Sequence, residues 1–500
     1  MRLNLPNDVE FILRKTGGYI VGGCVRDILL GKEPSDYDFT GSMRPSEVIA
    51  LFSNDYKIVE TGLEYGTVVI MINNTAYEYT TYRKDVGSKD SRHPEKVFFS
   101  DILEEDLERR DFTVNSIAYN HDVGIVDIFN GVKDIENKVI RAVGNPDERF
   151  KEDALRMIRA IRIASQHGFT IDKDTYNAIK SNAHLIKYIS KERVSKEISK
   201  ILLGKNPQYI EKLVETGISD FIFPDISKMF REKQNNPNHW RNGNPTTVGQ
   251  HTMETLEAAV KNGEKNSIYN ELGVRLALLL HDVGKSYTRK NKYKEKLGNI
   301  DVFYGHPEVS SDISKVLLKN LKFPKKIIDE VSLLIKVHDM DIKIQDCDGK
   351  IVPNEYVLRK IYALFGATNK NNMYNANLLL KKFFAIKKCD AIGQNPLAVQ
   401  GFSLSSAEKV RILDCISEYV FNNMDRLNVI MPVNGYYIAK ALGISSNEMK
   451  INGNIIGKVL KKLQDKIIRD NSIIEILKDE ERSNKYIQNL ALSMGLKIKI

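Results

Sequence analysis

The sequence predicts an α+β protein in which a mixed α/β region is followed by helices up to the carboxyl end. Short apolar runs alternating with turn signals indicate strands and are confined to residues 1–140, whereas a helical period begins near residue 150. The chain of 500 residues is also too long for one hydrophobic core. We therefore expect an α/β domain at the amino end and several all-α domains after it.

Four segments of the first region are predicted to be strands: YIVGG at 19–23, SDYDFT at 35–40, TVVIMI at 67–72 and YEYTTY at 77–82. Beyond residue 150, one face of a predicted helix is formed by Leu155, Ile158, Ile161 and Ile163. Residues 232–247 are polar and rich in Asn and Pro, which predicts a loop or a domain boundary. Helical patterns resume at about residue 251.

The charge balance weakly favours a polyanionic partner. The net charge of +9 would attract nucleic acid, although an ordinary basic protein explains it equally well. No C-x-x-C pair occurs among Cys24, Cys347, Cys389 and Cys415, which argues against a disulfide framework and a cysteine zinc site. No run approaches the roughly 20 apolar residues that span a bilayer, and the amino end lacks leader features, so we expect a cytoplasmic protein without membrane contact.

The segment from Gly22 to Asp38 carries the strongest chemical signal. The pair Gly22-Gly23 follows an apolar strand and would let backbone N–H groups approach a phosphate, to which Arg26 could add a charged contact. Asp36 and Asp38 are two apart on a predicted strand, so both carboxylates should point to one face.

Two carboxylates this close repel each other, and Mg²⁺ would remove that cost. A pair of such ions about 4 Å apart can activate a hydroxyl and stabilise a leaving pyrophosphate. An Asp-x-Asp pair alone is more often a solvated turn, but the glycine pair upstream favours a catalytic site. Glu78 is either a third carboxylate of this site or a solvent-facing strand residue.

These motifs resemble those of a known family. GGCVRDILLG at 22–31 with DYDFT at 36–40 resembles the first signature of the bacterial-type (class II) tRNA nucleotidyltransferase and poly(A) polymerase family. RRDFTVN at 109–115 resembles the second signature. Glu152-Asp153-x-x-Arg156 resembles the nucleobase-selecting motif, and Glu192-Arg193-x-x-x-Glu197 resembles the helix that supports it. The likeness covers residues 15–200 closely and the rest more loosely.

The resemblance implies a nucleotidyltransferase head in which Asp36 and Asp38 are catalytic and bind Mg²⁺. The residues that it implies in nucleotide binding are Gly23, Arg26, Arg110, Asp111, Asn115, Asp153, Arg156, Arg159 and Arg162. Asp111 would accept from the ribose hydroxyl, and Arg109 or Arg110 would face phosphate. The family also associates a loop such as 83–94 with the switch from C to A addition, although an ordinary surface loop explains this segment too.

Base choice can be argued from Asp153 and Arg156, which are three apart on a predicted helix and so share a face. Cytosine and adenine both present an amino donor beside a ring-nitrogen acceptor, which this pair could match, whereas uracil and guanine present the opposite pattern. A hydrogen-bonding site rejects such mismatches by about 10⁴-fold. One pocket could therefore select C and A without a template, the alternative being an ordinary salt bridge within a helix.

A second set of residues resembles the HD superfamily of metal-dependent phosphohydrolases. Its members, in order, are His251, His281-Asp282, His306, His338-Asp339 and Asp390. His and Asp suit divalent metals, and the ligands that we expect are His251, His281, Asp282 and Asp390. Lys285 could contact a phosphate. The alternative is a metal-free scaffold that holds tRNA.

We predict four domains: a catalytic head at 1–145, a helical neck at 146–245, an HD domain at 246–395 and a helical tRNA-binding tail at 396–500. The tail carries an apolar stripe at helical spacing, formed by Ile455, Val459, Leu463, Ile467 and Ile468.

The predicted function is template-independent addition of CMP and AMP, from CTP and ATP, to the 3′ end of tRNA with release of pyrophosphate. The rivals are a poly(A) polymerase of the same family, an HD-type phosphohydrolase whose first domain only binds RNA, and a nonenzymatic tRNA chaperone. The presence of both Asp36 and Asp38 argues against the last two. The sequence leaves open whether all three nucleotides are added, the oligomeric state, and the metal and substrate of the HD domain.

Overall fold

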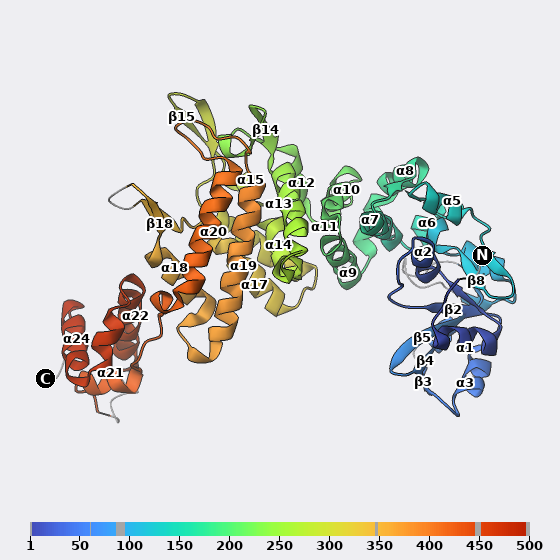
Figure 1. Ribbon diagram of the computed structural model, residues 1–500, viewed down its shortest axis with the longest axis horizontal. Helices are drawn as coiled ribbons and strands as arrows, with labels where there is room; N and C mark the ends of the chain where they lie inside the picture. The colour runs from blue at the N-terminus through green and yellow to red at the C-terminus, as the bar shows by residue number, and fades with distance from the viewer. Residues whose placement is uncertain (1–2, 61, 87–95, 346–348, 446–451, 497–500) are drawn as a thin grey trace. The chain divides into compact units, whose positions relative to one another are not determined.

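A computed structural model describes residues 3–60, 62–86, 96–345, 349–445 and 452–496 of the chain. Its contacts divide the chain into two compact units (Figure 1), which are Met1–Phe230 with Leu317–Phe323, and Arg231–Val316 with Pro324–Ile500. Strands and helices are mixed in the first unit and helices predominate in the second, so the predicted α+β class is confirmed.

The first unit contains a seven-stranded sheet with the order β3-β4-β5-β2-β1-β8-β9. Its strands and the further short strands of the unit are β1 Tyr19–Val21, β2 Asp38–Gly41, β3 Lys57–Val59, β4 Thr67–Ile72, β5 Thr75–Thr81, β6 Arg83–Val86, β7 Lys96–Phe99, β8 Ala118–Asn120, β9 Gly124–Val126, β10 Val139–Ile140 and β11 Thr170–Ile171. Within this sheet β2 and β5 pair in parallel, and the other pairs are antiparallel.

Two of the predicted strands end differently from the prediction. The strand predicted at 19–23 stops at Val21, because Gly22 adopts a positive φ of 84° and helix α2 begins at Gly23. The strand predicted at 35–40 begins only at Asp38, so Asp36 precedes it. The predictions at 67–72 and 77–82 are confirmed by β4 and β5.

The helices of the first unit are α1 Asn7–Thr16, α2 Gly23–Leu29, α3 Pro45–Phe52, α4 Leu103–Glu108, α5 Gly131–Glu136, α6 Pro146–Glu152, α7 Leu155–His167, α8 Lys173–Asn182, α9 Lys191–Leu202, α10 Ile210–Glu215, α11 Ser219–Ile222 and α12 Pro224–Arg231. The predicted apolar face of α7 is buried, since Leu155 is only 4% exposed and Ile158, Ile161 and Ile163 are fully covered. This face packs against α9.

The helices of the second unit are α13 Val248–Gly263, α14 Leu272–Leu280, α15 Lys285–Thr288, α16 His306–Asn320, α17 Lys325–Val337, α18 Glu355–Tyr362, α19 Met373–Ile392, α20 Ser406–Asn422, α21 Gly435–Ala441, α22 Gly453–Arg469, α23 Ile473–Lys478 and α24 Glu480–Ser493. The predicted tail stripe lies on α22. There Val459, Leu463 and Ile467 are fully buried and belong to one cluster with residues of α21, α23 and α24. The part of the chain that the structure describes contains no helix long and apolar enough to span a membrane.

The second unit is not all-α, contrary to the prediction. It contains β12 Lys233–Gln234, β13 Trp240–Arg241, β14 Asn244–Thr247, β15 Lys290–Lys294, β16 Gly298–Val302, β17 Lys343–Gln345 and β18 Ile351–Pro353. The segment 232–247 is therefore no irregular loop but a three-stranded sheet, which begins just after the division between the units. These strands are two to four residues long, too short for an alternating pattern to reveal them.

Candidate active sites

The first candidate site lies where β2 runs between β1 and β5 in the head sheet. Asp38 is the first residue of β2 and stands opposite Glu78 of β5 in a parallel pair, so both side chains project from the same face. Asp36, just before β2, is exposed and accepts a hydrogen bond of 2.9 Å from Ser35 Oγ. The shared face of Asp36 and Asp38 was predicted from one strand, whereas the structure adds the neighbouring strand through Glu78.

The electrostatics of Asp38 show that three carboxylates act on one another here. Asp38 is open to solvent on one side, yet the protein atoms around it partly desolvate its carboxyl group. This burial, together with the negative charges of Asp36 and Glu78, raises the pKa of Asp38 to about 6, against the opposing effect of Arg110. Such a set of acidic oxygens would be relieved by a divalent cation, and oxygen ligands are those that Mg²⁺ prefers.

A buried hydrogen-bond chain connects the predicted nucleotide-binding residues behind this face. Arg26 donates to Asn115 Oδ1 at 2.7 Å, and Asn115 Nδ2 donates to Asp111 Oδ1 at 3.0 Å. Arg159 Nε donates to the other oxygen of Asp111 at 2.8 Å. Burial alone would raise the pKa of Asp111, but Arg159 and Asn115 hold it well below its usual range.

The carboxylate of Asp111 already accepts a full set of hydrogen bonds from within the protein. It accepts two bonds from Arg159, one from Asn115 and one from the backbone N–H of Phe112, which use about all its lone pairs. The contact with a ribose hydroxyl, expected from the resemblance, would require one of these donors to move. The geometry indicates that Asp111 positions Arg159 and Asn115.

We expect Asp111→Asn to destabilise the protein by about 2 kcal/mol, because it leaves the Arg159 charge without its buried partner. Since the folded pKa of Asp111 is lowered, its contribution is present at neutral pH and is lost as the pH falls through that pKa. Urea unfolding at pH 7 and at about pH 2.5, which lies between the lowered pKa of folded Asp111 and the ordinary carboxyl pKa, would show the difference in unfolding free energy between variant and wild type narrowing in acid. Asp122→Asn, at an exposed turn, serves as the control, and an equal gap at both values would contradict the assignment.

Arg110 and the glycine pair meet on the same face. Arg110 donates to the buried Asp106 at 3.0 Å, and its charge acts on Asp38. A Cβ atom placed on Gly22 would lie 3.3 Å from Arg110 NH1, so a side chain there would meet both a strained φ and this guanidinium. Gly23 is the first residue of α2, near Arg26.

The predicted pairing of Asp153 with Arg156 is wrong in its geometry. Asp153 lies between α6 and α7 with extended φ and ψ of −144° and 101°, so the two residues do not share one helix face. Asp153 instead accepts from Arg193 at 2.7 Å, and its other oxygen accepts from the backbone N–H of Leu155. Arg156 contacts Glu152 and the carbonyl oxygens of Arg149 and Arg109.

Helix α9 contributes as the resemblance implies. Arg193 is the residue that holds Asp153, and Glu197 accepts from Arg162 Nε at 2.5 Å. The charged segment predicted to switch base choice falls largely outside the described residues, since 87–95 are not described.

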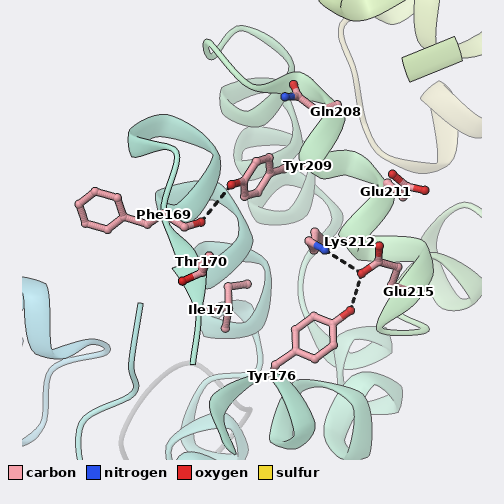
Figure 2. A pocket seen from close by; sticks show the side chains of 9 residues that line it. All are labelled: Phe169, Thr170, Ile171, Tyr176, Gln208, Tyr209, Glu211, Lys212 and Glu215. Atoms are coloured by element: carbon pink, nitrogen blue, oxygen red, sulfur yellow. Dashed lines mark hydrogen bonds and ion pairs between the residues drawn. The ribbon is translucent and has the colours of Figure 1, made fainter. Parts of the chain in front are cut away.

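A separate pocket of the first unit contains none of the predicted site residues (Figure 2). It has a volume of about 520 Å³ and lies among α8, α10 and β11. Glu215 accepts from both Tyr176 and Lys212 there, which closes one wall.

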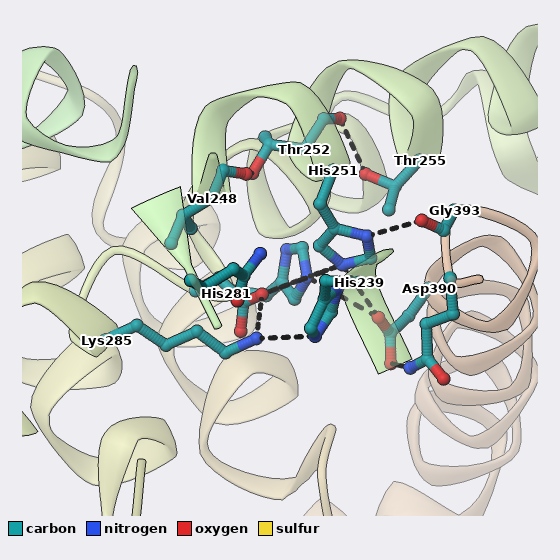
Figure 3. A network of polar contacts seen from close by, with 12 residues as sticks. His239, Val248, His251, Thr252, Thr255, His281, Lys285, Asp390 and Gly393 are labelled. Carbon is teal, nitrogen blue, oxygen red and sulfur yellow. Dashed lines mark hydrogen bonds and ion pairs between the residues drawn. The ribbon is translucent and has the colours of Figure 1, made fainter. Parts of the chain in front are cut away.

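The second candidate site is a buried cluster formed by side chains at or next to five helices of the second unit, α13, α14, α16, α17 and α19 (Figure 3). His251 comes from α13, His281-Asp282 follow α14, and Asp390 comes from α19. His251 Nε2 lies 3.0 Å from Asp390 Oδ1 and 3.3 Å from His281 Nε2. The four ligands predicted from the sequence are therefore brought together.

The second half of the cluster was not among the predicted ligands. His306, at the start of α16, and His338, at the end of α17, have their Nε2 atoms 3.3 Å apart. Asp282 Oδ1 lies 3.3 Å from His306, while Asp282 Oδ2 lies 3.3 Å from His281. Asp282 therefore stands between two histidine pairs, and each pair with Asp282 could hold one cation.

Hydrogen bonding fixes which nitrogen of each ring carries the proton. Each of the four rings places Nδ1 against a backbone carbonyl oxygen, which can only accept, so Nδ1 must donate: the carbonyls are those of Gly393, Leu278, Phe303 and Ile335. In neutral rings every Nε2 is then a lone pair, and it faces both the Nε2 of its partner ring and a carboxylate oxygen of Asp282 or Asp390, so these positions bring acceptors together with no proton between them. This arrangement is repulsive by itself and is the one in which histidines ligate metals.

Neighbouring positive groups hold Asp282 in its ionised form. Burial would raise the pKa of Asp282, but His281 and Lys285 hold it well below its usual range. Lys285 Nζ lies 2.7 Å from Asp282 Oδ2 and 3.2 Å from His239 Nε2. His239, which the sequence did not point to, ends a one-turn 3₁₀ helix, Pro237–His239, ahead of α13 and lines the same pocket of about 310 Å³.

Three segments of the chain match known family models. Residues 18–141 match the poly A polymerase head domain, residues 168–230 match the family described as "Probable RNA and SrmB- binding site of polymerase A", and residues 248–367 match the HD domain.

Curated relatives and solved structures point the same way. The chain is 49% identical over 233 residues to a CCA-adding enzyme of Ligilactobacillus salivarius, which covers 45% of this chain and 55% of that protein. It is 47% identical over 205 residues to one of Geobacillus thermodenitrificans, covering 41% and 50%. The chain thus spans about half the length of the curated relatives it matches.

Among solved structures, the CCA-adding enzyme of Bacillus stearothermophilus in complex with CTP has a similar fold. The TM-score is 0.60, with 24% identity over 97% of this chain and 98% of that chain. The chain thus carries a poly A polymerase head domain followed by an HD domain, and about two fifths of it is similar in sequence to CCA-adding enzymes.

Proposed function

We propose that the protein adds CMP and AMP, from CTP and ATP, to the 3′ end of tRNA in the cytoplasm without a nucleic-acid template. The observation that carries this proposal is the set of three carboxylates on and just before the paired strands β2 and β5, with the charge of Arg110 acting on Asp38. Curated relatives named CCA-adding enzymes, 49% and 47% identical over the matched regions, support it. Domain limits of 1–145, 146–245, 246–395 and 396–500 are part of the proposal.

In this proposal Asp36 and Asp38 hold Mg²⁺, with Glu78 beside them. Bound Mg²⁺ would lower the pKa of the attacking 3′-hydroxyl and stabilise the leaving pyrophosphate. Arg110 faces the triphosphate. The hydrogen bonds that connect Arg26 through Asn115 and Asp111 to Arg159 keep the wall of the site in one conformation.

The test is to incubate the protein with tRNA lacking its CCA end and with each nucleoside triphosphate, and to sequence the products. Addition of C, C and A would support the proposal. A homopolymer made from ATP alone would assign the poly(A) polymerase activity of the same family. No product at all from metal-supplemented protein would overturn both.

Base choice depends, in this proposal, on Asp153 being held by Arg193. We expect Arg193→Ala to raise misincorporation of UTP or GTP about 10-fold, because the freed carboxylate no longer presents one fixed oxygen to the base. Competition assays with paired triphosphates would measure this. Lys196→Ala, an exposed lysine of the same helix, is the matched control, and unchanged selectivity in Arg193→Ala would contradict the role.

We also propose that the HD domain binds divalent cations and hydrolyses phosphate esters. The observation that favours this second function is the arrangement of two histidine pairs. In each pair two Nε2 atoms face each other, and Asp282 lies between the pairs. A cation there would lower the pKa of bound water toward 7. Metal analysis, followed by assays on 2′,3′-cyclic and 3′-phosphorylated substrates with Mg²⁺, Mn²⁺, Ni²⁺ or Co²⁺, tests it. Absence of both metal and hydrolysis would leave a scaffold only.

A further inference from the structure

The hairpin β15–β16 connects two segments of the chain that line the HD pocket. The chain leaves the cluster at Asp282 and Lys285 and forms the hairpin over 290–302. It then returns through Tyr304, which lines the pocket, to His306. Both ends of the hairpin are therefore fixed at the candidate metal site.

Strand β16 is hydrogen-bonded to the segment at Asn235, whereas strand β15 is exposed to solvent. The buried Asp301 of β16 accepts from the backbone N–H of Asn235 at 2.7 Å and donates its own N–H to the Asn235 carbonyl at 2.8 Å. Every residue of β15 is exposed. The outer strand thus presents its side chains to solvent beside the pocket.

The free strand is strongly basic. Lys290, Lys292 and Lys294 alternate along β15, so they project from one face of the strand about 7 Å apart. That spacing is close to the separation of successive phosphates in an extended single strand. Within the described part of the chain none of the three forms an ion pair with a carboxylate, so their charges are available to a ligand.

Aromatic side chains accompany these lysines. Tyr304, which lines the pocket, is 65% exposed, whereas Tyr293 is 70% exposed but projects from the opposite face of β15. Lysines on an edge strand also protect it from aggregation, but that role does not require tyrosines. Basic side chains with exposed aromatic rings bind single-stranded nucleic acid, since the rings stack on bases and the lysines follow the backbone.

We propose that the β15–β16 hairpin binds single-stranded RNA and guides its phosphorylated 3′ end into the HD pocket. The substrate of this domain is then an RNA end, not a free nucleotide. Tyr304 stacks on a base at the mouth of the pocket, the lysines of β15 contact the backbone, and Lys285 lies deepest, beside Asp282. The inference rests on the proposed hydrolase function for its chemistry, while the binding step stands apart from it.

The test compares two substrates in the full chain loaded with metal. One is a short single-stranded RNA with a 3′-phosphate, which cannot be extended by the head, and the other is p-nitrophenyl phosphate. In the variant K290Q/K292Q/K294Q we expect kcat/KM for the RNA to fall at least about 10-fold, and the slope of log affinity against log salt to fall by about 2. The value for p-nitrophenyl phosphate should stay unchanged.

Tyr304→Ala should lower RNA affinity about 10-fold by loss of one stacked base, whereas Tyr293→Ala, on the other face of β15, should leave it unchanged. The control variant K261Q/K265Q/K336Q removes the same number of exposed lysines from α13, the residues after it and α17, and should behave as wild type. Equal losses on both substrates, or unchanged RNA hydrolysis in the hairpin variant, would overturn the proposal.

Cross-linking separates the two proposals. RNA carrying 4-thiouridine near its 3′ end should, on irradiation, label the peptide that contains Tyr304. If wild type hydrolyses neither substrate but this peptide is labelled, the hydrolase function fails and the RNA-binding hairpin holds. If hydrolysis occurs but labelling maps elsewhere, the hairpin proposal fails and the hydrolase function holds.

Discussion

Asp36→Ala and Asp38→Ala should each reduce nucleotide addition by at least about 10³-fold while tRNA binding persists. Either change removes one of the charges that, with Glu78, we propose to hold Mg²⁺ beside β2 and β5, and metal assistance contributes several kcal/mol to such a transfer. Gel-resolved extension of tRNA lacking its CCA end, next to a filter-binding assay on the same preparations, measures both effects.

The design of this experiment separates catalysis from folding. Asp55→Ala, at an exposed turn of the same unit, is the matched control and should extend tRNA at the wild-type rate. Glu78→Gln should fall between the control and the aspartate variants if Glu78 is the third carboxylate. Near-normal extension by both aspartate variants would remove the catalytic assignment.

The Asp36→Ala variant should also change the pKa of Asp38. Asp38 has its pKa raised to about 6 by burial and by Asp36. Asp36→Ala removes one of the charges that raise the pKa of Asp38, so that pKa should move down toward the usual carboxyl range.

The candidate site around Asp36 and Asp38 could be predicted from the sequence because its signals are local. Gly22-Gly23 and Asp36-x-Asp38 lie within 17 residues, and the strand alternation around them is regular. Glu78 was ambiguous because its position beside Asp38 depends on a parallel pairing between strands 40 residues apart. No local pattern specifies that register.

The error at Asp153 has a physical cause in the helix itself. An Asp side chain competes with the helical backbone for N–H donors, and here it accepts from Leu155 N–H at the start of α7. This breaks the helix at Asp153, so counting three residues to Arg156 no longer gives a shared face. The partner that does reach Asp153 is Arg193, 40 residues later.

In the HD cluster the sequence predicted which four side chains meet, but it did not predict the other contacts of the cluster. Its order of His and Asp residues predicted that four side chains meet, and they do. The two histidine pairs that share Asp282, and the approach of His239, depend on how α13, α16 and α17 pack, which spacing along the chain does not determine.

Asp282→Asn should abolish metal binding and hydrolysis in the HD domain while nucleotide addition continues. Asp282 is the residue that both histidine pairs share, with one oxygen toward His281 and the other toward His306. The change leaves a side chain of nearly the same volume but without the negative charge that offsets a buried cation. We expect bound metal to fall to background and hydrolysis of 3′-phosphorylated RNA to fall by about 10³-fold.

Single-pair variants make this expectation sharper. His338→Ala removes only the pair farther from Asp390, so it should leave about half of the bound metal if the two positions fill independently. Asp312→Asn, on an exposed turn of α16, should retain all of it. Thermal unfolding of each variant checks that the loss is not a loss of fold. Wild-type protein that binds no metal, or Asp282→Asn protein with unchanged hydrolysis, would reduce the cluster to a scaffold. Nucleotide addition lost together with the metal would mean that the domain supports the head instead of acting on phosphate esters.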